Sequence, residues 1–266
     1  MDVVKPDHAL PSSCGVAVMA KASTPGRTKT RLVPPLTFEE AAAFNTAFLQ
    51  DVAANILAAA KHADIAGYMA FGPPGPDSVS FFEQVLAPDI GLFEAWFPNL
   101  GDCLFGAVEQ LLGRGHAAAV VLNSDSPTMP TSFLIETAMV LAQPGDCAVL
   151  GPATDGGYNL LGLKHAHRRL FEDIAWSTEQ VARQTLERAA EIGLRVHVLP
   201  AWYDVDDAES LKTLHSELCE EAVISASLEA HQAPHSARLM RSLAAGTDLL
   251  SRLASGGATD AQRAAE

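Results

Sequence analysis

A cluster of positive charges in residues 21–32 (KASTPGRTKTRL) has the composition of a phosphate-binding loop. The cluster comprises Lys21, Arg27, Lys29 and Arg31. Gly26 belongs to a tight turn, which lets backbone N–H groups approach an anion. The loop follows an apolar run at 15–20, and cations beside a strand end suit the neutralisation of a diphosphate or triphosphate. A solvated basic loop is the alternative, but the chain has only 18 Lys and Arg against 32 Asp and Glu, so this local concentration of cations favours phosphate binding.

Carboxylates follow two other apolar runs and are candidates for holding a metal ion. Asp125 comes after the most apolar run of the chain, 117–123, with Ser124 beside it as a candidate nucleotide contact. Asp204 and Asp206 follow a later apolar run. A carboxylate at a strand end can hold Mg²⁺ or Mn²⁺ while the metal bridges phosphate oxygens. Taken alone, each aspartate is equally compatible with a helix cap or a turn, and Asp204 and Asp206 rank as near equals for a second metal ligand.

Residues 151–163 (GPATDGGYNLLGL) predict a loop that passes close to a ligand, because two glycines follow an acidic residue there. A type I′ turn, for which Asp-Gly is a favoured signature, is the competing interpretation. Asp102, in NLGDC, either contacts the nucleotide or caps the helix that follows. The candidates for contacts with the substrate are Asp155, Gly156, Gly157, Tyr158, Asn159 and Trp176. The candidates expected to act in catalysis are Lys29, Arg31, Asp125 and Asp155.

The histidines and cysteines form no pattern typical of catalysis or of zinc binding. The histidines considered are His116, His165, His167 and His197. They stand in no HExxH or nucleophile arrangement, so we expect them to be packed or solvated. The cysteines are scattered without a CxxC pair, which argues against a zinc site and against a disulfide framework. A GxSxG elbow is absent from the sequence, which disfavours a serine hydrolase.

Short apolar runs alternate with longer amphipathic ones, and this alternation predicts the elements that position the candidates. The predicted strands lie at 15–20, 65–71, 117–123, 147–150, 159–163 and 195–199. The predicted helices lie at 37–62, 104–112 and 132–141, followed by one that the Ser177–Gln180 pair caps and that reaches residue 192. A last helix, which Asp206 or Asp207 caps, ends at 218, and Thr37–Glu40 is the capping pair of the first. Region 78–97 is compatible with a short helix and then a strand. The alternation indicates an α/β fold with a mostly parallel sheet and a ligand site beyond the carboxyl ends of its strands.

The length, the composition and the net charge of the chain are those of one globular domain with an acidic surface. Residues 15–222 are predicted to form a nucleotide-binding domain, and residues 223–266 a C-terminal helix and an Ala-, Ser- and Gly-rich tail without a catalytic role. The net charge of -14 argues against nucleic acid and anionic membranes as partners. The start shows no signal peptide and no run is long enough to span a bilayer, so we expect a cytoplasmic protein.

Five segments in register resemble a bacterial family of glycosyltransferase-A-like proteins, within the nucleotide-diphospho-sugar transferase superfamily. The segments are KASTPGRTKTRL, LNSDSPTMP, LGPATDGGYNLLGL, IAWSTEQV and WYDVDDAESL, and they span residues 15–218. Members of this family are often encoded near radical SAM enzymes and include an arsenosugar-associated group. The same segments are more distantly similar to 2-phospholactate guanylyltransferase and molybdenum-cofactor guanylyltransferase.

The resemblance implies a single-domain, three-layer sandwich with the cations of residues 21–31 near phosphates. It also implies Asp125 on a divalent metal and the 155–158 loop around the acceptor or sugar. One segment departs from the family pattern: a GDLGxR-like stretch is common there, whereas this chain has GDCLFG. An arginine expected near Gly106 is therefore missing, which bears on the identity of the donor or the acceptor.

Two reactions fit these expectations. In the first, a glycosyltransferase moves a sugar from an NDP-sugar to a small-molecule acceptor, and family labelling favours it. In the second, a phosphorylated or hydroxylated small molecule attacks the α-phosphate of an NTP and pyrophosphate leaves, and the dense basic loop favours this nucleotidyl transfer. A non-catalytic nucleotide-binding regulator is a third interpretation, which the missing arginine motivates and the retained aspartates oppose.

Overall fold

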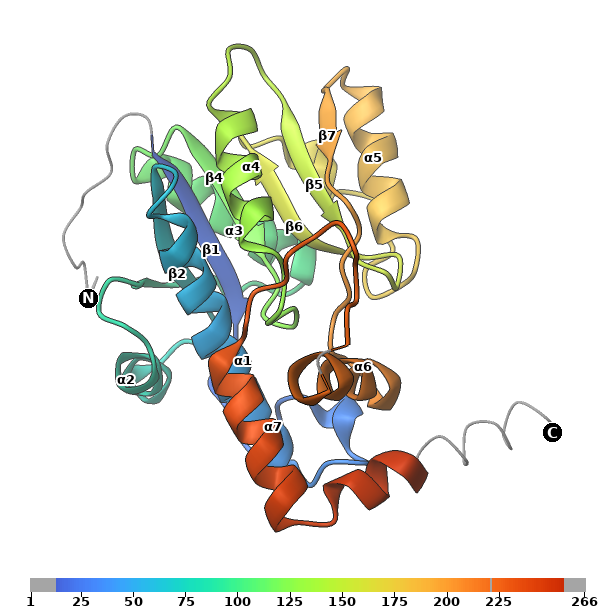
Figure 1. Ribbon diagram of the computed structural model, residues 1–266. Helices are drawn as coiled ribbons and strands as arrows, with labels where there is room; N and C mark the ends of the chain where they lie inside the picture. The colour runs from blue at the N-terminus through green and yellow to red at the C-terminus, as the bar shows by residue number, and fades with distance from the viewer. Residues whose placement is uncertain (1–12, 221, 256–266) are drawn as a thin grey trace.

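The computed structural model describes residues 13–220 and 222–255, in which strands and helices alternate (Figure 1). The elements in chain order are β1 (Cys14–Ala20), η1 (Thr30–Leu32), α1 (Phe38–Ala59), β2 (Ile65–Phe71), α2 (Pro76–Val85), β3 (Gly91–Glu94), α3 (Leu100–Gly113), β4 (Ala118–Leu122), α4 (Thr131–Leu141), β5 (Ala148–Pro152), β6 (Tyr158–Leu163), η2 (Arg168–Phe171), α5 (Val181–Glu191), β7 (Val196–Val198), α6 (Ala208–Cys219) and α7 (Pro234–Gly246). The first 12 residues, for which we predict no signal peptide, and residues 256–266 of the predicted tail lie outside the described residues. Among the helices of the described part, none has both the length and the apolar character that crossing a membrane requires.

A seven-stranded sheet with the order β3-β2-β1-β4-β6-β5-β7 lies at the centre of the molecule. Within the described residues, β6 is the one strand that runs antiparallel to its neighbours, β4 and β5, while the other pairs are parallel. A short turn joins β5 to β6, and such a turn can connect antiparallel strands but not parallel ones. The predicted α/β fold with a mostly parallel sheet is therefore confirmed.

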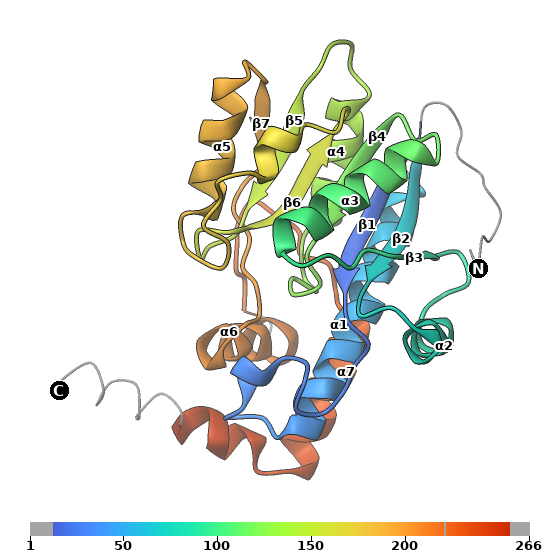
Figure 2. The same ribbon diagram turned by 180° about the vertical axis from the view of Figure 1, so that it is seen from behind.

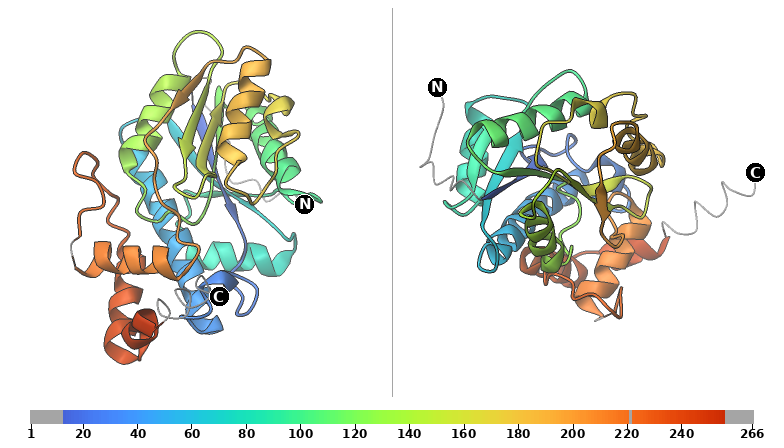
Figure 3. Two further views of the ribbon diagram at one scale, coloured as in Figure 1. Left: turned by 90° about the vertical axis from the view of Figure 1, so that its right-hand side faces the viewer. Right: turned by 90° about the horizontal axis from the view of Figure 1, so that it is seen from above.

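Helices cover both faces of the sheet and complete three layers (Figure 2 and Figure 3). On the face of α1 and α4, the strand residues Val16 and Val18 pack in one apolar cluster with Phe44. On the face of α3 and α5, Ala17 belongs to a second cluster together with Leu111. Successive residues of a strand point to opposite faces, so a strand that is covered on both sides must be apolar throughout. This is why the central strands are the clearest apolar runs in the sequence.

Within the described residues, side-chain caps are present at the starts of α1, α3 and α6 but not at the start of α5. The capping box predicted for α1 is present: Glu40 N–H donates to Thr37 Oγ1 (3.2 Å) and Thr37 N–H donates to Glu40 Oε2 (2.7 Å). Region 78–97 contains the end of α2 and all of β3. The predicted Ser177–Gln180 cap is wrong, because α5 starts after Gln180 without a side-chain cap bond and the backbone of Ser177 is left-handed (φ 64°).

The carboxylate of Asp51, on the buried face of α1, holds the first turn of α7. Asp51 is fully buried and accepts hydrogen bonds from the backbone N–H of His235 (2.9 Å) and of Ser236 (2.7 Å). The Ser236 hydroxyl donates a third bond (2.5 Å). A negative charge at a helix N-terminus also complements the helix dipole. These bonds explain why α7 packs along α1 (Figure 1).

We expect Asp51→Asn to lower the free energy of unfolding by about 2 kcal/mol, because the amide offers one acceptor oxygen to three donors and carries no charge. Urea denaturation of the full chain measures this change. Asp89→Asn, an exposed position before β3, is the matched control and should unfold like the unaltered protein. Equal stability of the two variants would contradict the anchoring of α7 by Asp51.

Candidate active site

The carboxyl ends of β1 and β4 and the segment after β7 meet around the side chain of Lys29. The ammonium of Lys29 contacts Asp125 Oδ1 (2.8 Å) and Asp206 Oδ1 (3.2 Å), and it donates to the Val205 carbonyl (2.8 Å). Its side chain is 7% exposed and its Nζ lies 5.3 Å from the ring centroid of Phe48. The structure thus places Lys29, which we predict near phosphates, between two of the predicted metal ligands.

Asp125 is held in its ionised form in this cluster. Burial acts to raise the pKa of Asp125, but the charge of Lys29 and the hydrogen bonds from Lys29 and from Ser124 Oγ (2.7 Å) outweigh it, so this pKa lies below its ordinary value. The Asp125 carbonyl accepts a bond from Val205 N–H (2.8 Å), which ties the loop after β4 to the segment after β7. Ser124, a predicted nucleotide contact, here orients the carboxylate of its neighbour.

Asp204 and Asp206 carry negative charge that the cluster does not balance. Burial, together with the charges of Asp125 and Asp206, raises the pKa of Asp204 to about 6, although hydrogen bonds with Ser126 and Asn123 oppose the rise. Burial and the charge of Asp125 likewise raise the pKa of Asp206, although Lys29 opposes the rise. Three neighbouring carboxylates thus share one ammonium, which contacts Asp125 and Asp206, and the surplus negative charge favours a further cation.

The cap of α6 is neither of the two ranked aspartates but the next one along the chain. Asp207 Oδ1 accepts a hydrogen bond from Ser210 N–H (2.8 Å), and the two residues complete a capping box. Of the two caps predicted as alternatives, Asp207 is thus correct. Asp204 and Asp206 are consequently not engaged as the helix cap, and both line the cavity described next.

A cavity of about 430 Å³ opens beside the aspartates. The predicted candidates that line it are Arg31, Asp125, Asp155, Gly157, Tyr158, Asn159, Trp176, Asp204 and Asp206. Apolar side chains such as Met19 and Leu104 complete part of the wall. The rings of Tyr158 and Trp176 meet edge to face, with centroids 6.4 Å apart, and burial raises the pKa of Tyr158. The Tyr158 hydroxyl is buried without a hydrogen-bond partner among the described residues.

The loop that contains Asp155 is a hairpin turn as well as a wall of this cavity. It joins β5 to β6, and Gly157 N–H donates to Asp155 Oδ1 (2.8 Å). Gly156 has a φ of 92°, and a Cβ there would lie 2.1 Å from the carbonyl oxygen of Glu179. Gly156 is thus required by its close packing against the start of α5. A hairpin turn is present, but it is not the predicted type I′ turn, because Gly156 has a positive φ and Asp155 does not. A substrate contact of Asp155 stays a prediction.

Three predicted phosphate contacts, Lys21, Gly26 and Arg27, lie on the exposed loop before η1, outside the cavity lining. The predicted turn is present: Gly26 has a φ of 73°, and Arg27 N–H donates to the Thr24 carbonyl (3.0 Å). The Lys21 ammonium lies 6.0 Å from the ring centroid of Trp96. These cations can reach a phosphate only where a ligand extends out of the cavity towards the loop.

The GDCLFG segment forms the first two turns of α3. The cap of this helix is Asn99, which accepts a bond from Asp102 N–H (2.8 Å), so the predicted capping role of Asp102 is wrong. The Asp102 carboxylate instead forms an ion pair with Arg168 (2.5 Å). A Cβ at Gly106 would lie 2.5 Å from the ring of Phe97. The place of the missing arginine is therefore closed to a side chain unless Phe97 moves.

Sequence reasoning missed several residues of the site. Asn123 and Glu179 line the cavity, and Ser126 binds Asp204. All three lie within the segments that carry the family resemblance, close in sequence to the predicted candidates. This closeness could have indicated that they belong to the site. The pairing of Arg168 with Asp102, which lies outside the cavity lining, had no such signal, because the two residues are 66 positions apart along the chain.

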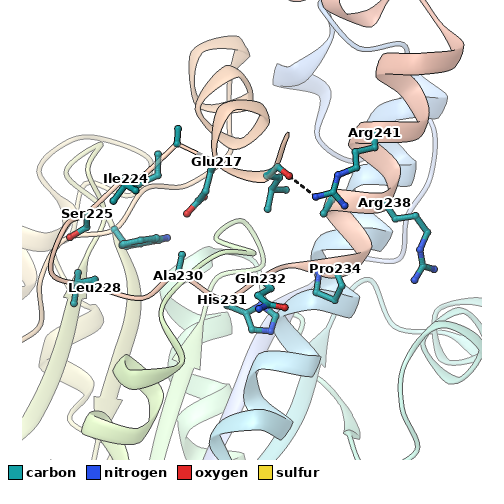
Figure 4. Close-up of a pocket in the computed structure, with 15 residues that line it drawn as sticks. Glu217, Ile224, Ser225, Leu228, Ala230, His231, Gln232, Pro234, Arg238 and Arg241 are labelled. Atoms are coloured by element: carbon teal, nitrogen blue, oxygen red, sulfur yellow. Dashed lines mark hydrogen bonds between the residues drawn. The ribbon is translucent and has the colours of Figure 1, made fainter. Parts of the chain in front are cut away.

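A larger hollow of about 840 Å³ lies between α6, α7 and the segment that connects them (Figure 4). Glu217 from α6 and Arg238 and Arg241 from α7 surround it, and Arg241 donates to the Leu218 carbonyl (2.8 Å). None of the sequence-predicted candidates lines this hollow. The smaller cavity, which adjoins the aspartates, is therefore the candidate active site.

Comparisons with known proteins give a family match and a fold. Residues 55–178 match the family DUF2064, described as an uncharacterized protein conserved in bacteria. A comparison with curated protein sequences gave no significant match. A protein from Desulfovibrio desulfuricans G20, provisionally assigned as a nucleotide-diphospho-sugar transferase, is 24% identical over 87% of this chain and 95% of its own, with a TM-score of 0.74.

A more distant solved structure belongs to a CMP–2-keto-3-deoxy-manno-octonic acid synthetase in complex with CTP. It is 12% identical over 79% of this chain and 100% of its own, with a TM-score of 0.50. At these identities the likeness establishes the fold. The chain is thus a single-domain α/β protein with the fold of the nucleotide-diphospho-sugar transferases, and its structural neighbours are transferases.

Proposed function

We propose that this protein is a transferase that depends on a divalent metal and acts on a nucleotide sugar. The observation that carries the proposal is a cavity of about 430 Å³ at the carboxyl ends of the parallel strands, lined by three aspartates, two of which contact the buried ammonium of Lys29. In open α/β sheets these ends are where ligands bind. The cavity also has the size of a small-molecule site.

The residues of the cluster fit a Mg²⁺ or Mn²⁺ ion. Their donors are carboxylate oxygens, which hard divalent cations prefer, and the surplus negative charge on Asp204 and Asp206 suits a cation. A cationic group already contacts two of the carboxylates, since Lys29 binds both Asp125 and Asp206. When bound, the metal supplies charge neutralisation at phosphate oxygens.

The other side chains of the cavity have separate tasks in this proposal. Arg31 faces the cavity from η1 and would bind a phosphate of the ligand. Lys29 would neutralise phosphate charge once its contacts with the aspartates are released. Tyr158 and Trp176 form an aromatic part of the cavity wall, which suits a sugar or a small acceptor. Asp155, which also lines the cavity, would accept a bond from a hydroxyl of that group.

Glycosyl transfer remains our first proposal, and nucleotidyl transfer is the second. Of the four loop cations, Arg31 is the one that lines the cavity, and one exposed guanidinium favours a diphosphate over a triphosphate. The CTP complex of the similar synthetase supports the second reaction, in which pyrophosphate leaves. The retained aspartates argue against a regulator that lacks turnover. The likeness to the arsenosugar-associated group stays a prediction.

A thermal-shift panel of NTPs, NDPs and NDP-sugars, each with and without Mg²⁺, tests the proposal. A ligand at 100 times its Kd adds about 2.7 kcal/mol to the stability of the folded state, which gives a shift of several degrees. We expect the largest shift from an NDP-sugar in the presence of Mg²⁺. A larger shift from an NTP would replace glycosyl transfer with nucleotidyl transfer. No metal-dependent shift from any ligand of the panel would overturn the proposal.

A further inference from the structure

A second group of potential metal ligands lies at the opposite end of the strands from the aspartates. Asp146 precedes β5, whereas His165 and His167 follow β6. Because β6 runs antiparallel to β5, its carboxyl end meets the amino end of β5. The loop before β5 projects beyond this end of the sheet, far from α6 (Figure 1). The three side chains are therefore separate from the candidate active site.

The three side chains already converge on one another. His165 Nδ1 lies 3.0 Å from Asp146 Oδ1, and His167 Nε2 lies 2.8 Å from Asp146 Oδ2. The potential ligand atoms all lie within 4.8 Å of one another. In a tetrahedral zinc site the ligand atoms are about 3.3 Å apart, given metal–ligand distances near 2.0 Å. Shifts of about 1 Å would therefore suffice for all three to share an ion.

The backbone around this group is held in place by contacts other than those of the ligands. The Lys164 ammonium binds the carbonyl oxygens of Gln143 (2.5 Å) and Gly145 (2.8 Å), which joins the loop before β5 to the loop after β6. His167 N–H donates to the His165 carbonyl (2.9 Å). The two loops are thus pre-positioned, so that binding an ion would order side chains rather than backbone. The charge of Lys164 opposes a cation here, but its bonds to the carbonyls direct it to the backbone.

We propose that Asp146, His165 and His167 form a binding site for Zn²⁺. Two imidazoles and one carboxylate suit a borderline cation, whereas Mg²⁺ and Mn²⁺ prefer oxygen donors alone. The His165 side chain is 68% exposed, so water can complete the coordination. The site could not be predicted from the sequence, because the HAH spacing matches no zinc motif. Asp146 comes close to the two histidines only through the pairing of β5 with β6.

Calorimetric titration of the full chain with Zn²⁺, in excess Mg²⁺ to occupy oxygen-donor sites, tests this proposal. We expect one strong site per chain, with at least a tenfold loss of affinity in His167→Gln and in Asp146→Asn. The matched control is His197→Gln, because His197 Nε2 pairs with Glu136 Oε1 (2.7 Å) in a two-residue contact without a third ligand. Thermal melts of all variants with a chelator establish that each variant is folded.

Two further outcomes decide between this site and the aspartates. Zn²⁺ affinity should be unchanged in Asp125→Asn, and Co²⁺ bound in place of Zn²⁺ should show a visible absorption that disappears in His167→Gln. Unchanged Zn²⁺ binding in His167→Gln, or loss of the strong site in Asp125→Asn or in His197→Gln, would overturn the proposal. The test is independent of the proposed transferase activity, because no nucleotide is present.

Discussion

Replacing Asp125 with asparagine is expected to abolish metal-dependent binding of the nucleotide ligand and to lower turnover by about a thousandfold or more, the scale of losing a major charge-stabilising group. The pKa of Asp125 lies below its ordinary value, so at neutral pH it offers a fully ionised carboxylate. The amide has a similar shape and can still accept the Ser124 bond, but it lacks the charge that a hard cation needs.

The measurement for Asp125→Asn is a thermal shift with the best ligand of the panel, with and without Mg²⁺, followed by turnover of that ligand. The variant should remain folded, because Lys29 keeps its bonds to Val205 and Asp206. Asp89→Asn, which is exposed, should retain the full metal-dependent shift. An unchanged metal dependence in Asp125→Asn would remove this residue from the site and with it the proposed ligand set.

Replacing Lys29 with methionine is expected to have opposite effects on stability and on metal binding. Without metal, the change leaves Asp125 and Asp206 without their cation and should cost about 2 kcal/mol of unfolding free energy. The cost is below that of a fully buried pair because the Asp206 side chain is 38% exposed. With Mg²⁺ alone, the variant should gain more stability than the unaltered protein, since the ion no longer competes with the ammonium for the same carboxylates.

Urea denaturation with and without Mg²⁺ measures both effects of Lys29→Met. Nucleotide affinity should fall by about tenfold if Lys29 turns to the phosphates in the complex. Lys61→Met, an exposed lysine after α1, is the matched control and should alter neither quantity. Equal stabilisation by Mg²⁺ in Lys29→Met and in the unaltered protein would show that the ion and the ammonium do not share these carboxylates.

The alternation of strands and helices, and the loops that carry the site, can be predicted from the amino-acid sequence alone. Strands buried on both faces must be apolar throughout, so β1, β2 and β4 are visible as apolar runs within one residue of their bounds. Helix caps such as Thr37–Glu40 depend on neighbours in the chain and are equally local. Because ligands bind at the carboxyl ends of parallel strands, these elements also identified Asp125, Asp204 and Asp206 as neighbours.

The pairing of the side chains, in contrast, depends on the three-dimensional fold. Lys29 forms an ion pair with Asp206, which is 177 residues away along the chain. Asp102 forms an ion pair with Arg168. Asp146 and the two histidines converge because β6 is antiparallel to β5. Such contacts depend on the order and direction of the strands and on the conformation of the loops. The local periodicity of apolar residues predicts none of these. The sequence therefore predicts at which end of the strands the candidate site lies, while the fold determines which charged side chains form ion pairs with one another.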